Sequence, residues 1–176
     1  MFFIESERLR LIPLTHDQLL LLKQNRNELE QAMGLQPSAM VIDAYFQQES
    51  KEALNGFWLP YTKAYHDLYP WYTNWQIVLK CINTTIGGIS LGGYPNDYGE
   101  TTVGYVVDEQ HWGEGYATEA LLTLTRWGFQ FSTLKYICAD TLVSNHASQQ
   151  VLQKAGFKYT HSINTTLYYR LSKYSQ

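Results

Sequence analysis

Hydrophobic side chains occupy every second position in the middle of the chain, at Val103, Tyr105 and Val107. Alternating β-branched and aromatic residues are typical of a pleated strand with one buried face. The pattern predicts a largely buried strand over residues 103–108.

The apolar positions change to spacings of three and four after residue 116. This spacing places them on one face of a helix of about four turns. The residues of this stripe are Ala117, Ala120, Leu121, Leu124, Trp127, Gly128 and Phe131. The chain is therefore predicted to pass from a strand through a short turn into an amphipathic helix.

Two glycines, Gly113 and Gly115, occupy the turn between this strand and this helix. Glycine accepts positive φ, and a helix that begins at such a turn leaves its first N–H groups unpaired beside the positive end of its dipole. Such groups form an anion site, most naturally for phosphate. A tight connection without a ligand is the alternative, and the geometry of the turn alone leaves both open.

Two phosphate-binding motifs fit the turn poorly. A P-loop requires Gly-Lys-Ser/Thr, whereas Tyr116 and Ala117 follow Gly115. A dinucleotide fingerprint requires a third glycine or alanine where Thr118 stands, although Asp140 has the place of a ribose-binding acid. The P-loop is excluded, and the dinucleotide-binding fold is weakened without being eliminated.

The N-terminal part of the chain predicts one strand and two helices. Residues 7–14 alternate as a strand with Pro13 at its end, and Thr15-His-Asp-Gln18 has the form of a capping box that starts a helix. A second helix is expected from residue 39 to about residue 55. Its candidates for burial are Val41, Ala44, Tyr45 and Ala53.

Strand patterns dominate the middle of the chain. Residues 75–82 and 85–91 form a predicted hairpin, and the loop 92–99 leads into the central strand. Gly87-Gly88 indicates a bulge or close backbone packing. This antiparallel meander precedes the glycine turn, whereas the glycine turn of a dinucleotide-binding domain follows its first strand. The order of elements therefore counts against that fold.

The C-terminal part predicts a strand over residues 135–141, parallel to the central strand because crossover connections are right-handed. Ser144 and Asn145 are suitable N-cap residues for a short helix that Gly156 ends. Closing strands are expected over residues 157–159 and 166–171.

Aromatic side chains are dense between residues 57 and 75. They either line a ligand pocket or fill and cover the core. The residues are Phe57, Trp58, Tyr61, Tyr65, Tyr69, Trp71, Tyr72 and Trp75.

The composition fits one globular domain, because 176 residues with 45% hydrophobic and 16% charged residues can bury a sizeable core. A net charge of −3 gives no electrostatic footprint for nucleic acid or an anionic membrane surface. Cys81 and Cys138 are expected to be buried free thiols in preference to a disulfide, and no Cys/His spacing suggests a metal site. With no signal peptide and no run of about 18 apolar residues, we expect a cytoplasmic protein.

Two motifs in order resemble the GNAT superfamily of acyl-CoA N-acyltransferases. Gln110-x-x-Gly113-x-Gly115 resembles its pyrophosphate turn, and Asn145-x-x-Ser148 followed by Ala155-Gly156-Phe157 resembles its second helical element. Gly-Tyr at 104–105 and the run 112–120 are similar to the branch typified by N-terminal acetyltransferases of ribosomal proteins. The likeness covers roughly residues 75–171 and the first strand.

The resemblance implies an α/β fold of the GNAT type in one domain, residues 1–176. We expect a mixed, mostly antiparallel twisted sheet of six to seven strands flanked by about four helices, with a parallel pair splayed at 103–108 and 135–141. It also implies acetyl-CoA as cosubstrate, an amine acceptor, no metal, no nucleic acid and no membrane, and a monomer or homodimer.

The resemblance further implies which residues bind coenzyme A. The turn would bind the pyrophosphate, the pantetheine arm would lie between the splayed strands, and an N–H near Val107 would act as a one-donor oxyanion site. The predicted residues are Val106, Val107, Gln110, His111, Trp112, Gly113, Glu114, Gly115, Tyr116, Ala117, Asn145 and Ser148.

Catalytic residues are less clearly indicated. Members of this branch often carry Glu where Thr102 stands, so Glu100 is the candidate base, and other members use Tyr as the acid where Leu152 stands. Ser148 has the place of the thiolate proton donor, with ordinary first-turn helix chemistry as its alternative. Asn145 would hold the arm or a water.

Three further residues near the motifs have a structural interpretation as well as a catalytic one. His111 and His146 are candidate proton shuttles, and a solvated histidine beside a loop is the simpler interpretation. Glu119 is expected to be a helix-face residue.

Three functions follow from these patterns. The leading hypothesis is an N-acetyltransferase that transfers acetyl directly to a primary amine, either a protein or peptide N-terminus or a small amine. A catalytically impaired domain that binds acyl-CoA is the alternative, and a nicotinamide-dependent oxidoreductase is the third. The acceptor is expected to contact the aromatic region 57–75 and the loop 92–99.

Overall fold

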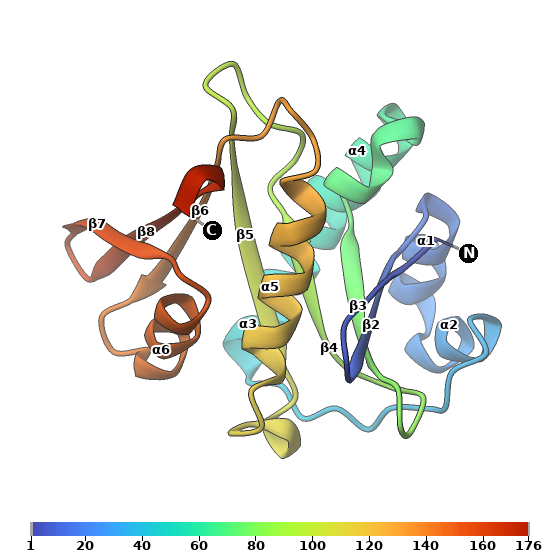
Figure 1. Cartoon of the computed structure of the whole chain (residues 1–176). Helices are drawn as coiled ribbons and strands as arrows, with labels where there is room; N and C mark the ends of the chain where they lie inside the picture. Colours follow the sequence, from blue (N-terminus) through green and yellow to red (C-terminus); the bar gives the residue numbers. More distant parts are fainter. Residues whose placement is uncertain (1, 176) are drawn as a thin grey trace.

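The computed structural model describes residues 2–175 and contains one sheet of eight strands in the order β1-β2-β3-β4-β5-β6-β8-β7 (Figure 1). The strands are β1 (Ile4–Glu5), β2 (Leu9–Pro13), β3 (Asn74–Leu79), β4 (Thr84–Leu91), β5 (Glu100–Val107), β6 (Tyr136–Leu142), β7 (Lys158–Ile163) and β8 (Thr166–Ser172). The helices are α1 (His16–Gln24), α2 (Arg26–Ala32), α3 (Ala44–Ala53), α4 (Leu59–Ala64), α5 (Tyr116–Gly128) and α6 (His146–Lys154). Short 3-10 segments cover His66–Trp71, Glu109–His111 and Lys173–Ser175. The mixed, mostly antiparallel architecture predicted from the sequence is confirmed, with one short strand and two helices more than expected.

The predicted capping box is present at the start of α1. The Thr15 side chain accepts a hydrogen bond from the Gln18 N–H, and the Gln18 side chain accepts one from the Thr15 N–H. The predicted single helix ends nine residues later, because Asn25 lies in an extended conformation and caps α2 through its side chain. Asn25 thus divides the segment into two helices.

The second predicted helix begins five residues later than expected. Asp43 accepts a hydrogen bond from the Tyr45 N–H and caps α3, which continues through a π-helical turn at Leu54–Trp58 into α4. The prediction of burial was wrong for Val41 and Tyr45, which are 49% and 56% exposed, and for Ala44, which is also exposed.

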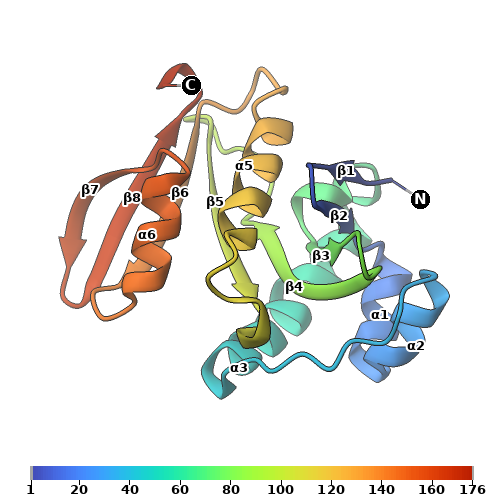
Figure 2. The ribbon, with the colours of Figure 1, turned by 60° about the horizontal axis from the view of Figure 1, so that its bottom comes forward.

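The two faces of the sheet carry different helices. Helices α5 and α6 cover one face, and α1 to α4 lie on the other (Figures 1 and 2). On β5, Val103 and Val107 pack in the core under α5, whereas Val106 faces the opposite side. Of the two cysteines, both free, Cys81 is exposed and Cys138 is partly buried, so the expected burial was wrong for Cys81.

The central strands approach each other closely at Gly87. A Cβ atom on this residue would lie 2.3 Å from the carbonyl oxygen of Val106 on β5. The close backbone packing predicted from Gly87-Gly88 is confirmed, and the register shift of this hairpin lies opposite, between Ile77 and Val78.

Strands β5 and β6 are parallel, as predicted, but they pair over only three positions. The pairs are Glu100 with Tyr136, Thr101 with Ile137, and Thr102 with Cys138. Beyond Thr102, β5 pairs only with β4 and β6 only with β8. The two strands therefore diverge toward the carboxyl end of β5, as Figure 1 shows. The predicted splay is present.

We expect Gly87→Ala to lower the free energy of unfolding by about 1 to 3 kcal/mol, because the added methyl would force β4 and β5 apart. Gly104→Ala is the matched control, since nothing lies within 4 Å of a Cβ at that position. It should change stability by less than about 0.5 kcal/mol. Urea unfolding of both variants checks this, and equal losses would contradict it.

Candidate active site

The turn before α5 has the backbone geometry of an anion site. Gly113 and Gly115 adopt φ of 83° and 80°, in the left-handed region that favours glycine. Among the described residues, no protein group accepts a hydrogen bond from the backbone N–H groups of residues 113–118. These consecutive donors lie at the positive end of the α5 dipole, where a pyrophosphate fits.

Arg8 and Glu119 clamp this turn to the N-terminal hairpin. The Glu119 carboxylate accepts hydrogen bonds from Arg8 Nε at 2.7 Å, from Arg8 N at 2.9 Å and from Ser6 Oγ at 2.7 Å. Arg8 Nη1 also donates to the Glu114 carbonyl at 3.0 Å, and its guanidinium lies 4.4 Å from the centre of the Tyr116 ring. Glu119 is therefore a positioning residue, in agreement with its prediction as a residue of the helix face. The contribution of Arg8 had no sequence signal, because 111 positions separate it from Glu119.

Asp108 holds the segment between β5 and the turn. Its side chain, 3% exposed, accepts hydrogen bonds from the N–H groups of Gln110 and Val41 and lies 3.1 Å from His111 Nδ1. The Trp112 indole donates to the Val107 carbonyl at 2.8 Å. The predicted cofactor residues His111 and Trp112 thus shape the turn through their side chains, while the Gln110 amide reaches the carbonyl of Ala39 at 3.4 Å.

The backbone groups that face the diverging strands belong to alternate residues of β5. Asp108 N–H binds the Ile86 carbonyl and Gly92 N–H binds the Thr102 carbonyl, so the even-numbered residues of β5 pair with β4. The groups of Val103, Tyr105 and Val107 face the other way. The predicted main-chain pairing of an arm with Val106 is therefore corrected to its odd-numbered neighbours. The Val107 carbonyl is already bound by Trp112, and its N–H faces the gap.

Tyr105 bridges β5 and α6 across the diverging strands. Its hydroxyl lies 3.0 Å from Ser148 Oγ, and Asn145 Oδ1 accepts a hydrogen bond from the Ser148 N–H at 3.0 Å. Burial raises the pKa of the Tyr105 phenol to about 12, and the hydrogen bond to Ser148 acts in the opposite direction. The phenol is thus a neutral hydrogen-bond donor near pH 7. The sequence drew attention to the Gly-Tyr pair but assigned Tyr105 no role.

Glu100 lies at the other end of β5, where the strands are still paired. Its carboxylate is 3.4 Å from Arg170 Nη1. Seven positions (107 − 100) separate it from Val107, or roughly 23 Å along a strand. A general base must lie within hydrogen-bond reach of its proton, directly or through one water. Glu100 and the Val107 N–H therefore cannot act on the same reacting carbon, and the two predictions exclude each other.

Two other residues and the aromatic region singled out in the sequence lie apart from any such centre. Leu152 is fully buried in the core. His146 is the first residue of α6, and no hydrogen bond of its side chain to another described residue is present. The aromatic region has two parts, because Trp58, Trp71 and Trp75 are core residues whereas four other rings form a cluster beside Gly93, three of them stacked and one tilted. These four are Phe57, Tyr61, Tyr65 and Tyr72.

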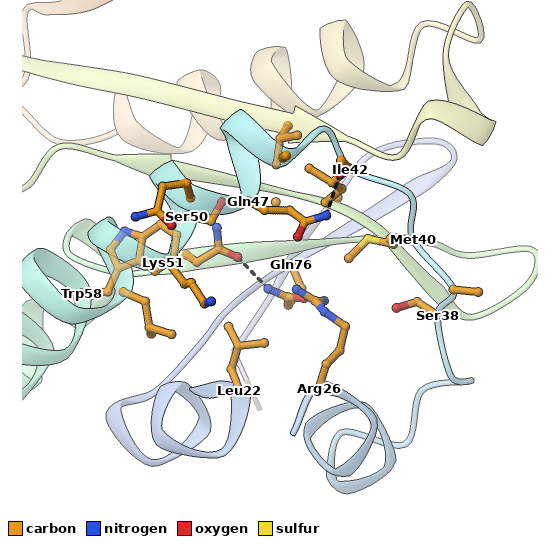
Figure 3. A pocket seen from close by; sticks show the side chains of 18 residues that line it. Leu22, Arg26, Ser38, Met40, Ile42, Gln47, Ser50, Lys51, Trp58 and Gln76 are labelled. Carbon is orange, nitrogen blue, oxygen red and sulfur yellow. Dashed lines mark hydrogen bonds between the residues drawn. The ribbon is translucent and has the colours of Figure 1, made fainter. Parts of the chain in front are cut away.

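A cavity of about 520 Å³ lies on the opposite face of the sheet from α5 (Figure 3). Its floor includes Gln76, Gly88 and Val106, and its walls come from α1 to α3 and the segment 38–42. The volume is in the usual range of small-ligand sites. Sequence reasoning missed this cavity, because it expected the acceptor site at the aromatic region and the loop 92–99.

In the part of the chain that the structure describes, no helix is long and apolar enough to cross a bilayer. Within residues 2–175 there is also no cluster of three or more His, Cys, Asp or Glu side chains able to hold a metal ion.

We expect Glu119→Gln to destabilise the protein by about 1 to 3 kcal/mol at pH 7, because the partly buried neutral amide lacks the charge that strengthens the hydrogen bonds from Arg8 and Ser6. Burial raises the pKa of Glu119, but the hydrogen bonds from Arg8 and Ser6 outweigh it and leave the pKa lowered. The stability that the ionised Glu119 carboxylate contributes is therefore complete above the unfolded-state pKa of about 4.3. It is lost as the pH falls through the folded-state pKa.

Urea unfolding of Glu119→Gln and the parent chain between pH 3 and pH 7 measures this difference. Glu7→Gln is the matched control, since Glu7 is exposed and forms no ion pair with the described residues. A difference that stays constant over the whole range would contradict the role assigned to the carboxylate.

Comparisons with known proteins agree with this geometry. The chain is 31% identical over 90 residues to an uncharacterized N-acetyltransferase, YjdG, of Bacillus subtilis, which covers 51% of this chain and 54% of that protein. It is 29% identical over 84 residues to a second one, YoaA, covering 48% of each. The chain spans about half the length of the curated relatives it matches.

Two solved structures share the fold. A putative ribosomal-protein-serine acetyltransferase from Vibrio cholerae has a TM-score of 0.65 at 19% identity, with 97% of each chain covered. An acetyl transferase from Salmonella typhimurium, described as modifying the N-terminal serine of ribosomal protein L7/L12, has a TM-score of 0.64 at 19% identity, with 97% of this chain and 99% of that one covered. The family model described as the acetyltransferase (GNAT) domain matches residues 8–158, which is most of the chain. The chain therefore belongs to the GNAT acetyltransferase family.

Proposed function

We propose that the protein is an acetyl-CoA-dependent N-acetyltransferase that transfers acetyl directly to a primary amine, on a peptide N-terminus or a small molecule. The observation that carries this proposal is the run of unpaired N–H groups at residues 113–118, placed where β5 and β6 diverge. A pyrophosphate on the turn and an extended arm along β5 use both features at once. The family membership and the N-acetyltransferase relatives support the same ligand.

The reacting sulfur is proposed to lie level with Tyr105. An arm that starts at the turn and runs along β5 passes Val107 first and then reaches Tyr105, whose hydroxyl contacts Ser148. Ser148 is the predicted proton donor to the thiolate. An N–H of Val107 or Tyr105 on the same edge would stabilise the developing oxyanion.

The chemical step forms a C–N bond and breaks a C–S bond. The neutral amine attacks the thioester carbonyl, the ammonium of the adduct loses a proton, and the thiolate leaves and gains one. Ser148, hydrogen-bonded to the neutral phenol of Tyr105, supplies the proton to sulfur. The amine loses its proton to water, because Glu100 is five positions from Tyr105, or roughly 17 Å away.

The acceptor amine is proposed to enter from the cavity. Val106 lines this cavity, and Gly104 leaves open space on the same face of β5. The amine would then meet the thioester from the face opposite α5. Asn145, with its side-chain oxygen engaged at the start of α6, would offer its amide nitrogen to the arm or to a water.

Release of free thiol from acetyl-CoA in the presence of an amine panel tests the function. The panel includes peptides with free N-termini, polyamines and aminoglycosides, and mass spectrometry locates the acetyl group. Thiol release no faster than the hydrolysis blank for every amine, together with tight binding of coenzyme A, would contradict transfer and favour an acyl-CoA-binding domain without turnover.

We expect Gly115→Asp to weaken coenzyme A binding at least about tenfold more than Gly115→Asn, because only the carboxylate opposes the phosphates. Both side chains tolerate positive φ and have nearly the same size, so the pair isolates the charge. Calorimetric titration with coenzyme A measures the two affinities. Equal affinities would place the phosphates elsewhere.

We expect Ser148→Ala and Tyr105→Phe each to lower kcat by about tenfold to a hundredfold, at the low end of general acid catalysis. Because the two hydroxyls act as one unit, the double variant should be no slower than the slower single variant. Coenzyme A affinity, measured by calorimetry, should change little.

Glu100→Gln tests which of two predictions holds, since Glu100 as general base and the Val107 N–H as oxyanion donor exclude each other. A change in kcat of less than about threefold is expected, because the carboxylate lies too far from Tyr105 for direct proton transfer. A loss as large as that of Ser148→Ala would restore Glu100 as the base and move the reaction centre toward the paired end of β5.

A further inference from the structure

The cavity on the α1 to α4 face is cationic. Arg26 and Lys51 are its charged residues, and the described residues that line it include neither a carboxylate nor an imidazole. Its other polar side chains are Ser38, Gln47, Gln48, Ser50, Asn74 and Gln76. In Figure 3 the Arg26 side chain reaches from α2 to Gln76 on the sheet, and Lys51 enters from α3.

Arg26 is fixed in position by neutral partners on the sheet. Its Nη1 donates to Gln76 Oε1 at 3.2 Å, and Gln76 Nε2 donates to Asn74 Oδ1 at 2.6 Å. Glu30 lies near the same Nη1 atom, whereas Nε and Nη2 form no hydrogen bond with the described residues. Planar donors held in this way suit a carboxylate.

Glu30 neutralises Arg26 only in part. Its carboxylate, 1% exposed, lies 3.6 Å from Arg26 Nη1 and accepts its own hydrogen bonds from Ser38 N at 2.8 Å and Ser38 Oγ at 2.5 Å. Burial lowers the pKa of the Arg26 guanidinium, and Glu30 acts in the opposite direction. The Arg26 side chain is still 35% exposed, and Glu30 lies beyond hydrogen-bond distance of it, so a second anion can approach the guanidinium.

Lys51 adds a charge without a partner of its own. Within residues 2–175 it forms no ion pair. Two cations in one cavity repel polyamines and lysine side chains, which are cationic, and they lower the pKa of an amine bound beside them.

The absence of a base from the described cavity lining favours an acceptor amine with a low pKa. With no carboxylate or imidazole on the described walls, the acceptor must lose its proton to water. A peptide α-amine has a pKa of about 7.7 to 8.0, whereas that of a lysine side chain is about 10.4. Only the α-amine is substantially neutral near pH 7.5.

We propose that the acceptor is a peptide α-amine with a carboxylate near its N-terminus, which Arg26 and Lys51 bind in this cavity; this rests on the N-acetyltransferase function proposed above. The α3 wall of the cavity is exposed at Gln47, Gln48 and Lys51, so the rest of the peptide has a path to solvent.

Calorimetric titration of the full chain, saturated with coenzyme A, tests this with four tetrapeptides. Ala-Glu-Gly-Gly-amide and Ala-Gln-Gly-Gly-amide have side chains of the same shape and differ in charge, and Ala-Lys-Gly-Gly-amide carries the opposite charge. Ala-Gln-Gly-Gly with a free C-terminus distinguishes a terminal carboxylate from one on a side chain. We expect at least one carboxylate-bearing peptide to bind about tenfold or more tighter than the neutral amide, which is the usual scale of a charged hydrogen bond.

Arg26→Gln and Lys51→Gln should each remove most of this preference. Because Arg26 also lies beside buried Glu30, its replacement can lower stability, and Lys51→Gln supplies the independent test. Lys63→Gln is the matched control, since Lys63 is an exposed lysine on α4 outside the cavity lining, and it should leave the preference unchanged.

Equal binding of acidic and neutral peptides, or a preference that survives in the Arg26→Gln/Lys51→Gln double variant, would overturn the inference. If those peptides are nevertheless acetylated, the proposed function stands and only the acceptor class fails. A preference for acidic peptides that depends on both cations, without acetylation of any peptide, would support the binding site and contradict the proposed function.

Discussion

The separation of β5 from β6 after three paired positions is the constraint on which the rest of the site depends. A central parallel strand normally forms hydrogen bonds on both edges, but beyond Thr102 one edge of β5 has no neighbouring strand. The structure compensates locally, since the Trp112 indole binds the Val107 carbonyl and Tyr105 reaches Ser148 on α6. The main-chain groups that remain are available to an extended ligand, and the turn that follows β5 presents further free N–H groups to it.

Successive side chains of β5 point to opposite faces of the sheet, so the two faces of this strand contact different parts of the protein. Odd-numbered residues pack Val103 and Val107 under α5 and direct Tyr105 to α6, whereas even-numbered residues face the other side, where Val106 lines the cavity. A ligand between the strands is therefore held from one face and is reached from the other. Gly104 contributes by having no side chain, because it leaves open space on the cavity face where β5 has lost its neighbour.

Local signals in the sequence predicted the parts of the fold that neighbouring residues determine. The Thr15 capping box, the positive-φ glycine at 115 and the Asn145 cap each depend on a few consecutive residues, and all three are present. Long-range contacts carry no such signal. The Arg8 clamp on Glu119 joins segments 111 positions apart, and Arg26 reaches Gln76 across 50 positions.

The same reason limits what the sequence can say of the catalytic base. Glu100 lies on the same strand face as Thr102, but face alone does not measure distance along the strand, and the pairing with β6 places Glu100 at the end where the two strands are still paired. Helical spacing also predicts burial of Val41, Ala44 and Tyr45, but Val41 precedes the Asp43 cap and the first turn of α3 is exposed. In both cases the periodic pattern predicts on which face of a helix or strand a side chain lies. Where that side chain lies along the element, and what surrounds it, depends on contacts with other parts of the chain.

The lack of a carboxylate or imidazole on the described cavity walls and the presence of two cations there are connected. A cationic cavity weakens a general base, because Arg26 and Lys51 would lower the pKa of a carboxyl or an imidazole group placed beside them. The same charges disfavour the ammonium form of a bound amine, and so they promote its loss of a proton to water. They also attract a carboxylate on the same acceptor. In the proposed acceptor site, one electrostatic feature would thus supply both the orientation of the acceptor and the ionisation state that attack on a thioester requires.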